Sequence, residues 1–224
     1  MSSRQTNFAP DEWYHCYTRS IDRQTVFRTP KDYERFLETL YLSNGDARVR
    51  RSDLYKPLHE VIFGLERGDP LIAIGAYCLM PNHFHLLLQE KSERGISTFM
   101  QRLGTSFTKY FNTKYDHVGN VFIGPFRSKY IADDRHLQHL VQYIHLNPIE
   151  LSEPGWKKGI IKNKHLIEKR LNDYRYGSLP DYYGTKRPQR SILDSGAIQF
   201  LGDTPPLADI LEEAGAYYAE LSFM

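Results

Sequence analysis

Long apolar runs are missing from this chain of 224 residues. No stretch of about 18 apolar residues occurs, so the sequence predicts no membrane-spanning helix. The start, MSSRQTNFAPDEW, lacks the apolar core of a secretory signal. The two cysteines, Cys16 and Cys78, form no C-x-x-C pair, which argues against a disulfide framework and against a four-cysteine zinc site. We therefore expect a protein of the reducing cytoplasm.

Charge is nearly balanced over the whole chain, at +2, but it is unevenly distributed. Residues 91–130 hold seven Lys or Arg against two acids, residues 156–190 hold ten against three, and residues 191–224 hold six acids and no Lys or Arg. Basic blocks in a near-neutral chain are typical of a surface that binds a polyanion, although random clustering on a solvated surface gives the same pattern. The 16 Tyr and 12 Phe suit stacking on unpaired bases as well as an ordinary core.

Hydrophobic periodicity predicts the order strand–helix–strand–strand–helix–strand–helix. The strands are expected within 12–22, 71–80, 83–90 and 119–132, and the helices at 29–44, 94–115 and 134–148. This order predicts an α+β fold, in which a ferredoxin-like antiparallel sheet has helices on one face and an added helix completes the domain. We assign this domain to residues 1–150. Residues 151–224 are expected to form a basic, then acidic, C-terminal extension that packs on the domain or on DNA.

Two histidines lie one residue apart in the strand expected at 83–90. Because strand side chains alternate, His83 and His85 face the same way, whereas Phe84 and Leu86 face the other way and can fill the core. Two imidazoles at this spacing can share one divalent metal ion. A histidine on a strand is also commonly a hydrogen-bonded structural residue, so this pattern leaves both roles open.

A second candidate site lies about sixty residues later, on the helix expected at 134–148. Tyr143 and Asn147 are four residues apart and therefore share one helix face. Asn147 offers a carbonyl oxygen to a hard cation. Tyr143 offers a phenol that can attack a phosphate polarised by a metal ion. The same two residues can equally be a half-buried helix tyrosine and a helix-terminal cap, so the helix alone does not decide between these roles.

Together these stretches resemble a known family. YCLMPNHFHLLLQ (77–89) followed by FRSKYIADDRHLQHLVQYIHLNP (126–148) is similar to the REP-associated tyrosine transposases, which are HUH-type single-strand nucleases with one catalytic tyrosine. The resemblance covers about residues 12–150 and implies that the N-terminal domain is catalytic. Many members follow Leu-Asn-Pro with Val-Arg-Ala-Gly, whereas this chain has Ile-Glu-Leu-Ser at 149–152.

The resemblance also implies the roles of individual residues. Tyr143 would be the nucleophile that forms a 5′-phosphotyrosine link, and His83, His85 and Asn147 would bind Mg²⁺ or Mn²⁺. The implied activity is that of a metal-dependent, sequence- and structure-specific single-stranded DNA endonuclease and strand transferase. Its implied partners are DNA hairpins formed by repetitive extragenic palindrome-like repeats. The implied localisation is cytoplasmic, and nucleoid-associated when the protein is bound to DNA. The oligomeric state can be a monomer or a homodimer.

Two other functions fit parts of the pattern. A domesticated protein that binds DNA or RNA hairpins without cleaving them needs the basic surface but no nucleophile. A metal-dependent hydrolase of small phosphoesters needs the metal ligands but favours more carboxylates and no basic surface.

Seven basic side chains are candidates for contacts with phosphate groups. They are Arg19, Arg23 and Arg28 near the first strand, Arg102 and Lys109 on the polar side of the helix at 94–115, and Arg127 and Lys129 on the last strand.

Overall fold

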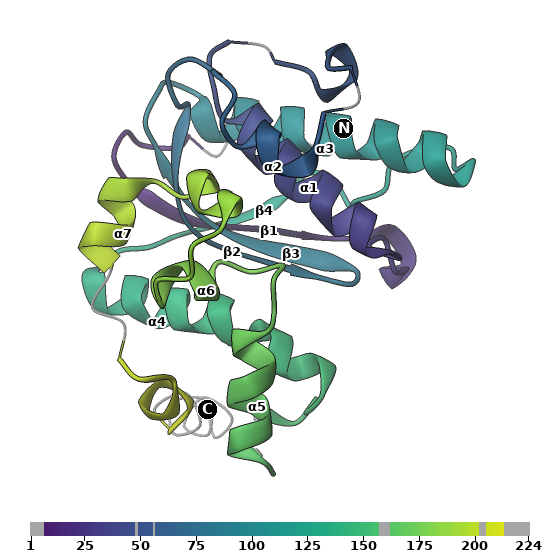
Figure 1. Cartoon of the computed structure of the whole chain (residues 1–224). Helices are drawn as coiled ribbons and strands as arrows, with labels where there is room; N and C mark the ends of the chain where they lie inside the picture. The colour runs from purple at the N-terminus through teal and green to yellow at the C-terminus, as the bar shows by residue number, and fades with distance from the viewer. Residues whose placement is uncertain (1–6, 48, 56, 157–161, 202–204, 213–224) are drawn as a thin grey trace.

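A computed structural model describes residues 7–47, 49–55, 57–156, 162–201 and 205–212 (Figure 1). The strands are β1 (Trp13–Arg19), β2 (Ile72–Met80), β3 (His83–Glu90) and β4 (Arg127–Tyr130). The α-helices are α1 (Pro30–Ser43), α2 (His59–Ile62), α3 (Gly95–Tyr115), α4 (Asp134–Leu146), α5 (Lys164–Asn172), α6 (Leu179–Tyr182) and α7 (Ser195–Leu201). Short 3-10 helices are η1 (Ile21–Arg23), η2 (Arg51–Asp53), η3 (Asn147–Leu151) and η5 (Pro188–Ile192). None of these helices is long and apolar enough to cross a membrane.

The four strands form one antiparallel sheet in the order β2-β3-β1-β4. A tight turn at Pro81 and Asn82 joins β2 to β3, as predicted for a hairpin. Strand β1 lies between β3 and β4, so that Cys16 is opposite Leu86 on one side and Ser128 on the other. α1 connects β1 to β2, and α3 connects β3 to β4. This topology confirms the predicted ferredoxin-like α+β fold.

α1 and α3 cover one face of the sheet (Figure 1). Phe84 of β3 points into this layer, where it meets Phe36 of α1 with ring centroids 4.9 Å apart. Phe36 in turn contacts Phe107 of α3 at 5.0 Å. Burial of each such side chain stabilises the fold by ~1.5–3 kcal/mol. Because Phe84 faces this core, its neighbours His83 and His85 face the opposite side of the sheet.

α1 starts as predicted, with Thr29 as its cap and Pro30 at its first position. The carboxylate of Asp32 accepts hydrogen bonds from the backbone N–H of Thr29 at 2.7 Å and, across to α3, from Lys114 at 2.6 Å and the Tyr110 hydroxyl at 2.8 Å. Burial alone would raise the pKa of Asp32, but these hydrogen bonds outweigh it and lower the pKa from 3.8 to about 2. Asp32 therefore stays ionised and ties the start of α1 to the end of α3.

α4 packs against the other face of the sheet (Figure 1). Its predicted apolar stripe of Leu137, Leu140, Val141 and Ile144 forms one buried cluster with Ala76, Cys78 and Met80 of β2 and Leu87 of β3. Asp133 caps the helix, because its carboxylate accepts the backbone N–H of His136 at 2.8 Å. α4 ends at Leu146, two residues before the predicted end. The chain then continues as η3, since Pro148 is tolerated in the first turn of a new helix.

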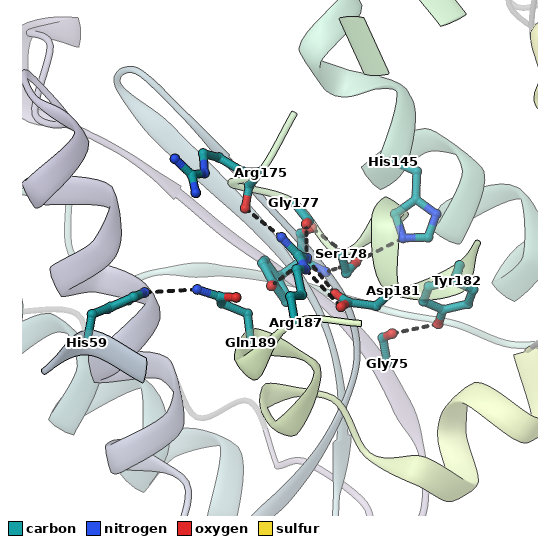
Figure 2. Close-up of polar contacts among 11 residues, drawn as sticks. His59, Gly75, His145, Arg175, Gly177, Ser178, Asp181, Tyr182, Arg187 and Gln189 are labelled. Carbon is teal, nitrogen blue, oxygen red and sulfur yellow. Dashed lines mark hydrogen bonds and ion pairs between the residues drawn. The ribbon is translucent and has the colours of Figure 1, made fainter. Parts of the chain in front are cut away.

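Residues 174–187 pack along the outer edge of β2, where residues 176–178 pair with the strand; Figure 2 shows the polar contacts of this segment. Gly177 forms an antiparallel bridge with Cys78, and the backbone N–H of Ser178 donates to a β2 carbonyl at 2.9 Å. The hydroxyl of Ser178 also lies 2.9 Å from Nε2 of His145, which is on α4. This part of the C-terminal extension therefore packs on the domain and contacts α4. The acidic end beyond residue 212 lies outside the described residues.

Arg187 holds this segment in place (Figure 2). Its guanidinium donates to the carboxylate of Asp181, with Nε 2.9 Å from Oδ1, and to the backbone carbonyls of Arg175 at 2.7 Å and Gly177 at 2.6 Å. Only 12% of the Arg187 side chain and 0% of the Asp181 side chain are exposed. A buried ion pair becomes costly when one partner is removed, because the other charge stays out of water.

We predict that Arg187→Leu lowers the free energy of unfolding by about 3–5 kcal/mol, because the substitution leaves the buried carboxylate of Asp181 without its cation. Urea unfolding followed by circular dichroism measures the change. The matched control is Arg175→Leu, which removes an exposed arginine side chain from the same segment and is expected to change stability by less than about 0.5 kcal/mol. Equal losses in the two variants would contradict the role assigned to Arg187.

Candidate functional site

The two histidines of β3 lie on the sheet face that α4 partly covers. His83 and His85 share this face as predicted, and their ring centroids are 5.1 Å apart at an interplanar angle of 87°. His85 is 6% exposed, and His83 is half-buried at the end of the strand. The alternation that sends Phe84 into the core thus places both imidazoles on the opposite sheet face, beside α4.

Tyr143 of α4 reaches the same place. Its ring lies edge-on to His85, with centroids 5.5 Å apart and an interplanar angle of 85°. The apolar stripe of α4 fixes this position, since Leu140 and Ile144 on either side of Tyr143 in the sequence are buried against the sheet. One chain therefore brings together the two motifs that sequence separates by about sixty residues.

Asn147 lies one turn beyond Tyr143 and is fully buried. Its side-chain Nδ2 donates to the backbone carbonyl of Tyr143 at 2.8 Å, so the residue also acts as a helix-terminal cap. Its Oδ1 is buried and accepts no hydrogen bond from the part of the chain that the structure describes. A buried acceptor in this state is costly unless a further group binds it. Asn147 itself does not line the cavity described next.

A cavity of about 740 Å³ opens beside α4, over β3, β1 and β4. Seven of the residues predicted for the site line it: His83, His85, Tyr143, Arg19, Arg23, Arg127 and Lys129. Its walls also include His136 and Leu140 of α4, and Ile123 and Pro125 from the loop that precedes β4.

The pairing of β4 with β1 determines where the basic side chains of the cavity lie. On β4, Arg127 lies opposite Tyr17 of β1, and Lys129 lies opposite His15. Both basic side chains are exposed. Because directly opposed residues of an antiparallel pair point to the same face, these cations stand on the same side of the sheet as the two histidines of β3. The cavity thus has imidazoles and a tyrosine on one side and cations on the other.

Three of the predicted basic residues lie elsewhere. The guanidinium of Arg28 stacks over the ring of Tyr115, 4.4 Å from its centroid. Arg102 donates to the backbone carbonyl of Gly45 at 2.5 Å. Lys109 is exposed on α3, which covers the opposite face of the sheet. These positions are not in the cavity, and their contribution to DNA binding stays a prediction.

His15 is a site residue that the sequence motifs did not reveal. Its Nε2 lies 2.9 Å from Nδ1 of His85, and its ring is stacked beside that of His85 with centroids 5.1 Å apart. Burial, with smaller contributions from the charges of Lys129 and His136, lowers the pKa of His15 from 6.5 to about 4, so the residue is neutral at pH 7. The alternation of β1 places His15 on the site face, but its contact with His85 depends on strand register.

Tyr17 and Glu150 also belong to the cavity and were not predicted. The ring of Tyr17 stacks on that of His85, with centroids 5.8 Å apart and an interplanar angle of 27°. Glu150 is exposed in η3, three residues after Asn147 and therefore about one 3-10 turn further on. Together with Asp22 it places carboxylates in a cavity whose other charged side chains are basic.

The residues present fit a divalent metal ion. His83 and His85 offer two imidazoles on one strand face, and Asn147 supplies the buried acceptor oxygen without a hydrogen bond. The described residues contain no group of three or more His, Cys, Asp or Glu that could hold a metal, so a site here needs the amide oxygen, the substrate or water to complete it. Imidazole ligands favour a transition metal, whereas the amide oxygen suits the harder ions Mg²⁺ and Mn²⁺.

Comparison with known proteins identifies a family and a shared fold. The family model described as "Transposase IS200 like" matches residues 10–147. One solved structure, of a REP-associated tyrosine transposase bound to a REP hairpin, aligns with a TM-score of 0.51 at 16% identity, over 82% of this chain and 86% of that one. This likeness supports the fold. No curated protein gives a sequence match.

The match to the family model includes β1, both histidines of β3, Tyr143 and Asn147. It spans 138 of the 224 residues (10 to 147), which is more than half of the chain. From these motifs, their convergence on one cavity and the family match, we conclude that the chain belongs to the IS200-like transposase family.

Proposed function

We propose that this protein is a metal-dependent single-stranded DNA endonuclease and strand transferase that works through a 5′-phosphotyrosine intermediate. The observation that carries the proposal is the convergence of Tyr143 with His83 and His85 in one cavity rimmed by basic side chains. A protein that only binds DNA has no need of a tyrosine beside two strand histidines.

The residues of the chain supply most of the proposed reaction. The phenolic oxygen of Tyr143 attacks the phosphorus of a DNA phosphodiester and loses its proton to water. The bond between phosphorus and the 3′ oxygen breaks, and that oxygen takes up a proton to leave a free 3′-hydroxyl. The new tyrosine–phosphate ester conserves the bond energy, so attack by another 3′-hydroxyl reseals or transfers the strand without ATP.

A divalent ion held by His83, His85 and Asn147 would polarise the scissile phosphate and stabilise the charge that develops on it. The exposed cations Arg127 and Lys129 would hold the phosphates on either side of the attacked bond. We propose Mn²⁺ or Mg²⁺ as the ion.

We propose hairpin-forming single-stranded DNA as the substrate. A REP hairpin is bound by the structural relative, whose fold this chain shares over most of its length. A hairpin with a single-stranded foot suits the layout here, because the attacked bond must be flexible enough to pass between α4 and the loop before β4. We also propose that the protein acts in the cytoplasm, where its DNA would be found.

We predict that Tyr143→Phe abolishes the covalent protein–DNA adduct, because the variant lacks the attacking oxygen. The measurement is a denaturing gel of protein mixed with hairpin oligonucleotides, with Mn²⁺ or with EDTA, in which a 3′ label reports the adduct and a 5′ label reports the released fragment with its free 3′-hydroxyl. Wild-type protein should form the adduct with Mn²⁺ and not with EDTA. The variant should still bind the hairpin, since the substitution removes one hydroxyl and no charge.

The matched control is Tyr183→Phe, a partly exposed tyrosine of the C-terminal extension, which should form the adduct as the wild-type protein does. Tight hairpin binding by wild-type protein without adduct or cleavage, over several metals and substrates, would contradict the proposal and would favour the non-catalytic hairpin-binding protein.

We predict that the double variant Arg127→Gln/Lys129→Gln weakens binding to single-stranded DNA and flattens its salt dependence. Removal of each phosphate-binding cation should reduce the slope of log K against log[salt] by ~0.7, or by ~1.4 for both residues. Fluorescence anisotropy of a labelled oligonucleotide between low and moderate salt measures this slope.

The matched control for that experiment is Lys31→Gln/Lys91→Gln. It removes the same charge from two exposed lysines, one at the start of α1 and one directly after β3, that do not line the cavity. This variant should keep the wild-type slope. An equal loss of slope in both double variants would show that the DNA also runs over surfaces away from the cavity and would contradict a footprint confined to it.

A further inference from the structure

Both histidines of β3 have their Nδ1 atoms held by a polar neighbour. Nδ1 of His83 lies 2.7 Å from Oδ1 of Asn82, and Nδ1 of His85 lies 2.9 Å from Nε2 of His15. The neighbours come from different elements, one from the hairpin turn and one from β1. In both imidazoles it is therefore Nδ1 that faces a polar neighbour.

The contact at Asn82 fixes the position of one proton. Nδ2 of Asn82 donates to the backbone carbonyl of Arg23 at 3.1 Å, which settles the orientation of the amide and turns Oδ1 toward His83. Because Oδ1 can only accept, the ring of His83 must donate from Nδ1. A neutral imidazole that carries its proton on Nδ1 has its lone pair on Nε2.

The contact at His15 has two possible arrangements, because either ring nitrogen can be the donor. A metal ion bound by His85 needs a ring nitrogen with a lone pair, and Nδ1 of His85 faces His15. Metal binding by His85 therefore requires its lone pair on Nε2 and its proton on Nδ1, so that His15 accepts at its own Nε2. His15 must then carry its single proton on Nδ1.

Packing holds these rings in their planes. His15 is 8% exposed and His85 is 6% exposed. The ring of Tyr17 lies 4.7 Å from that of His15 and 5.8 Å from that of His85, while Tyr143 stands edge-on to both. Rotation of either imidazole would break these ring contacts together with the hydrogen bond.

We propose that His15 and Asn82 are positioning residues, which set the tautomers of His85 and His83 so that both rings present Nε2 to the same divalent ion. This inference rests on the proposed function, because it assumes that the two β3 histidines bind a metal. In this proposal both residues act through the β3 histidines that they contact and bind neither the substrate nor the ion. Partners of this kind orient a ligand and raise its basicity, and their loss costs about 10- to 100-fold in metal affinity.

The test compares His15→Leu with His15→Gln. Leucine fills the buried volume without an acceptor, whereas the Oε1 of glutamine can stand close to where Nε2 of histidine does and can accept the same hydrogen bond. The first readout is the ¹⁵N spectrum of the histidine rings in metal-free protein. The second is the Mn²⁺ dissociation constant from calorimetry. Circular dichroism and thermal unfolding confirm that each variant is folded.

In the wild-type spectrum, we expect His85 and His83 to carry their protons on Nδ1. His15→Leu should convert His85 into a mixture of tautomers and weaken Mn²⁺ binding by about 10- to 100-fold. His15→Gln should restore the single tautomer and bring the affinity back to within about threefold of the wild-type value. Asn82→Leu should produce the corresponding change at His83.

Three results would overturn the inference. A proton on Nε2 of His85 in the wild-type protein would place the lone pair on the wrong atom. Unchanged Mn²⁺ affinity in His15→Leu would show that the hydrogen bond does not matter. Equal loss in His15→Leu and His15→Gln would show that His15 is itself a ligand or acts only through packing. Failure of the wild-type protein to bind Mn²⁺ would instead overturn the proposed function, and the inference with it.

Discussion

Burial of the apolar stripe of α4 against β2 and β3 determines where Tyr143 lies. Ala76 and Cys78 are small side chains, so the helix can approach this half of the sheet closely, and Leu140 and Ile144 complete the contact. Tyr143 falls at the edge of the stripe, where the cavity opens over β3, β1 and β4. Residues 174–187 support the same arrangement from the outer edge of β2, through the contact of Ser178 with α4. The nucleophile and both histidines of the proposed site are thus held by elements of one chain.

The two faces of the sheet differ in the side chains that they carry. The face under α1 and α3 is filled with rings and aliphatic side chains and supplies stability. The other face is apolar where α4 and Leu201 of α7 cover it. Beyond α4 the surface passes from imidazoles on β3 to cations on β4, in the direction set by strand register. This layout allows a phosphate to lie beside Tyr143 with positive charge around it. Glu150 and Asp22 are the exceptions, since their carboxylates reduce the positive potential of the same cavity.

Local pattern predicted most of the fold and the centre of the site. Alternation along β3 predicted that His83 and His85 share one face, and the apolar stripe of α4 predicted the face on which Tyr143 lies.

Contacts set by long-range pairing were not predictable in this way. His15 meets His85 only because of how β1 pairs with β3. Arg28 and Arg102 look like phosphate ligands in the sequence, but Arg28 stacks on a tyrosine and Arg102 bonds a backbone carbonyl of another segment. Glu150 lines the cavity because the chain continues after α4 as the 3-10 helix η3, and no local sequence pattern predicted this helix.

Tyr143 lies beside the histidines of its own chain, and complementation between two inactive variants tests whether each proposed site is completed within one chain. Tyr143→Phe lacks the nucleophile, and His85→Ala lacks a proposed metal ligand. Each is mixed alone with a labelled hairpin and Mn²⁺, the two are then combined in equal amounts, and wild-type protein serves as the positive control. Because α4 lies on its own sheet, we expect no covalent adduct from the mixture at any protein concentration. Adduct formation that appears only when both variants are present would show that one chain lends its tyrosine to the histidines of another, and would contradict the account.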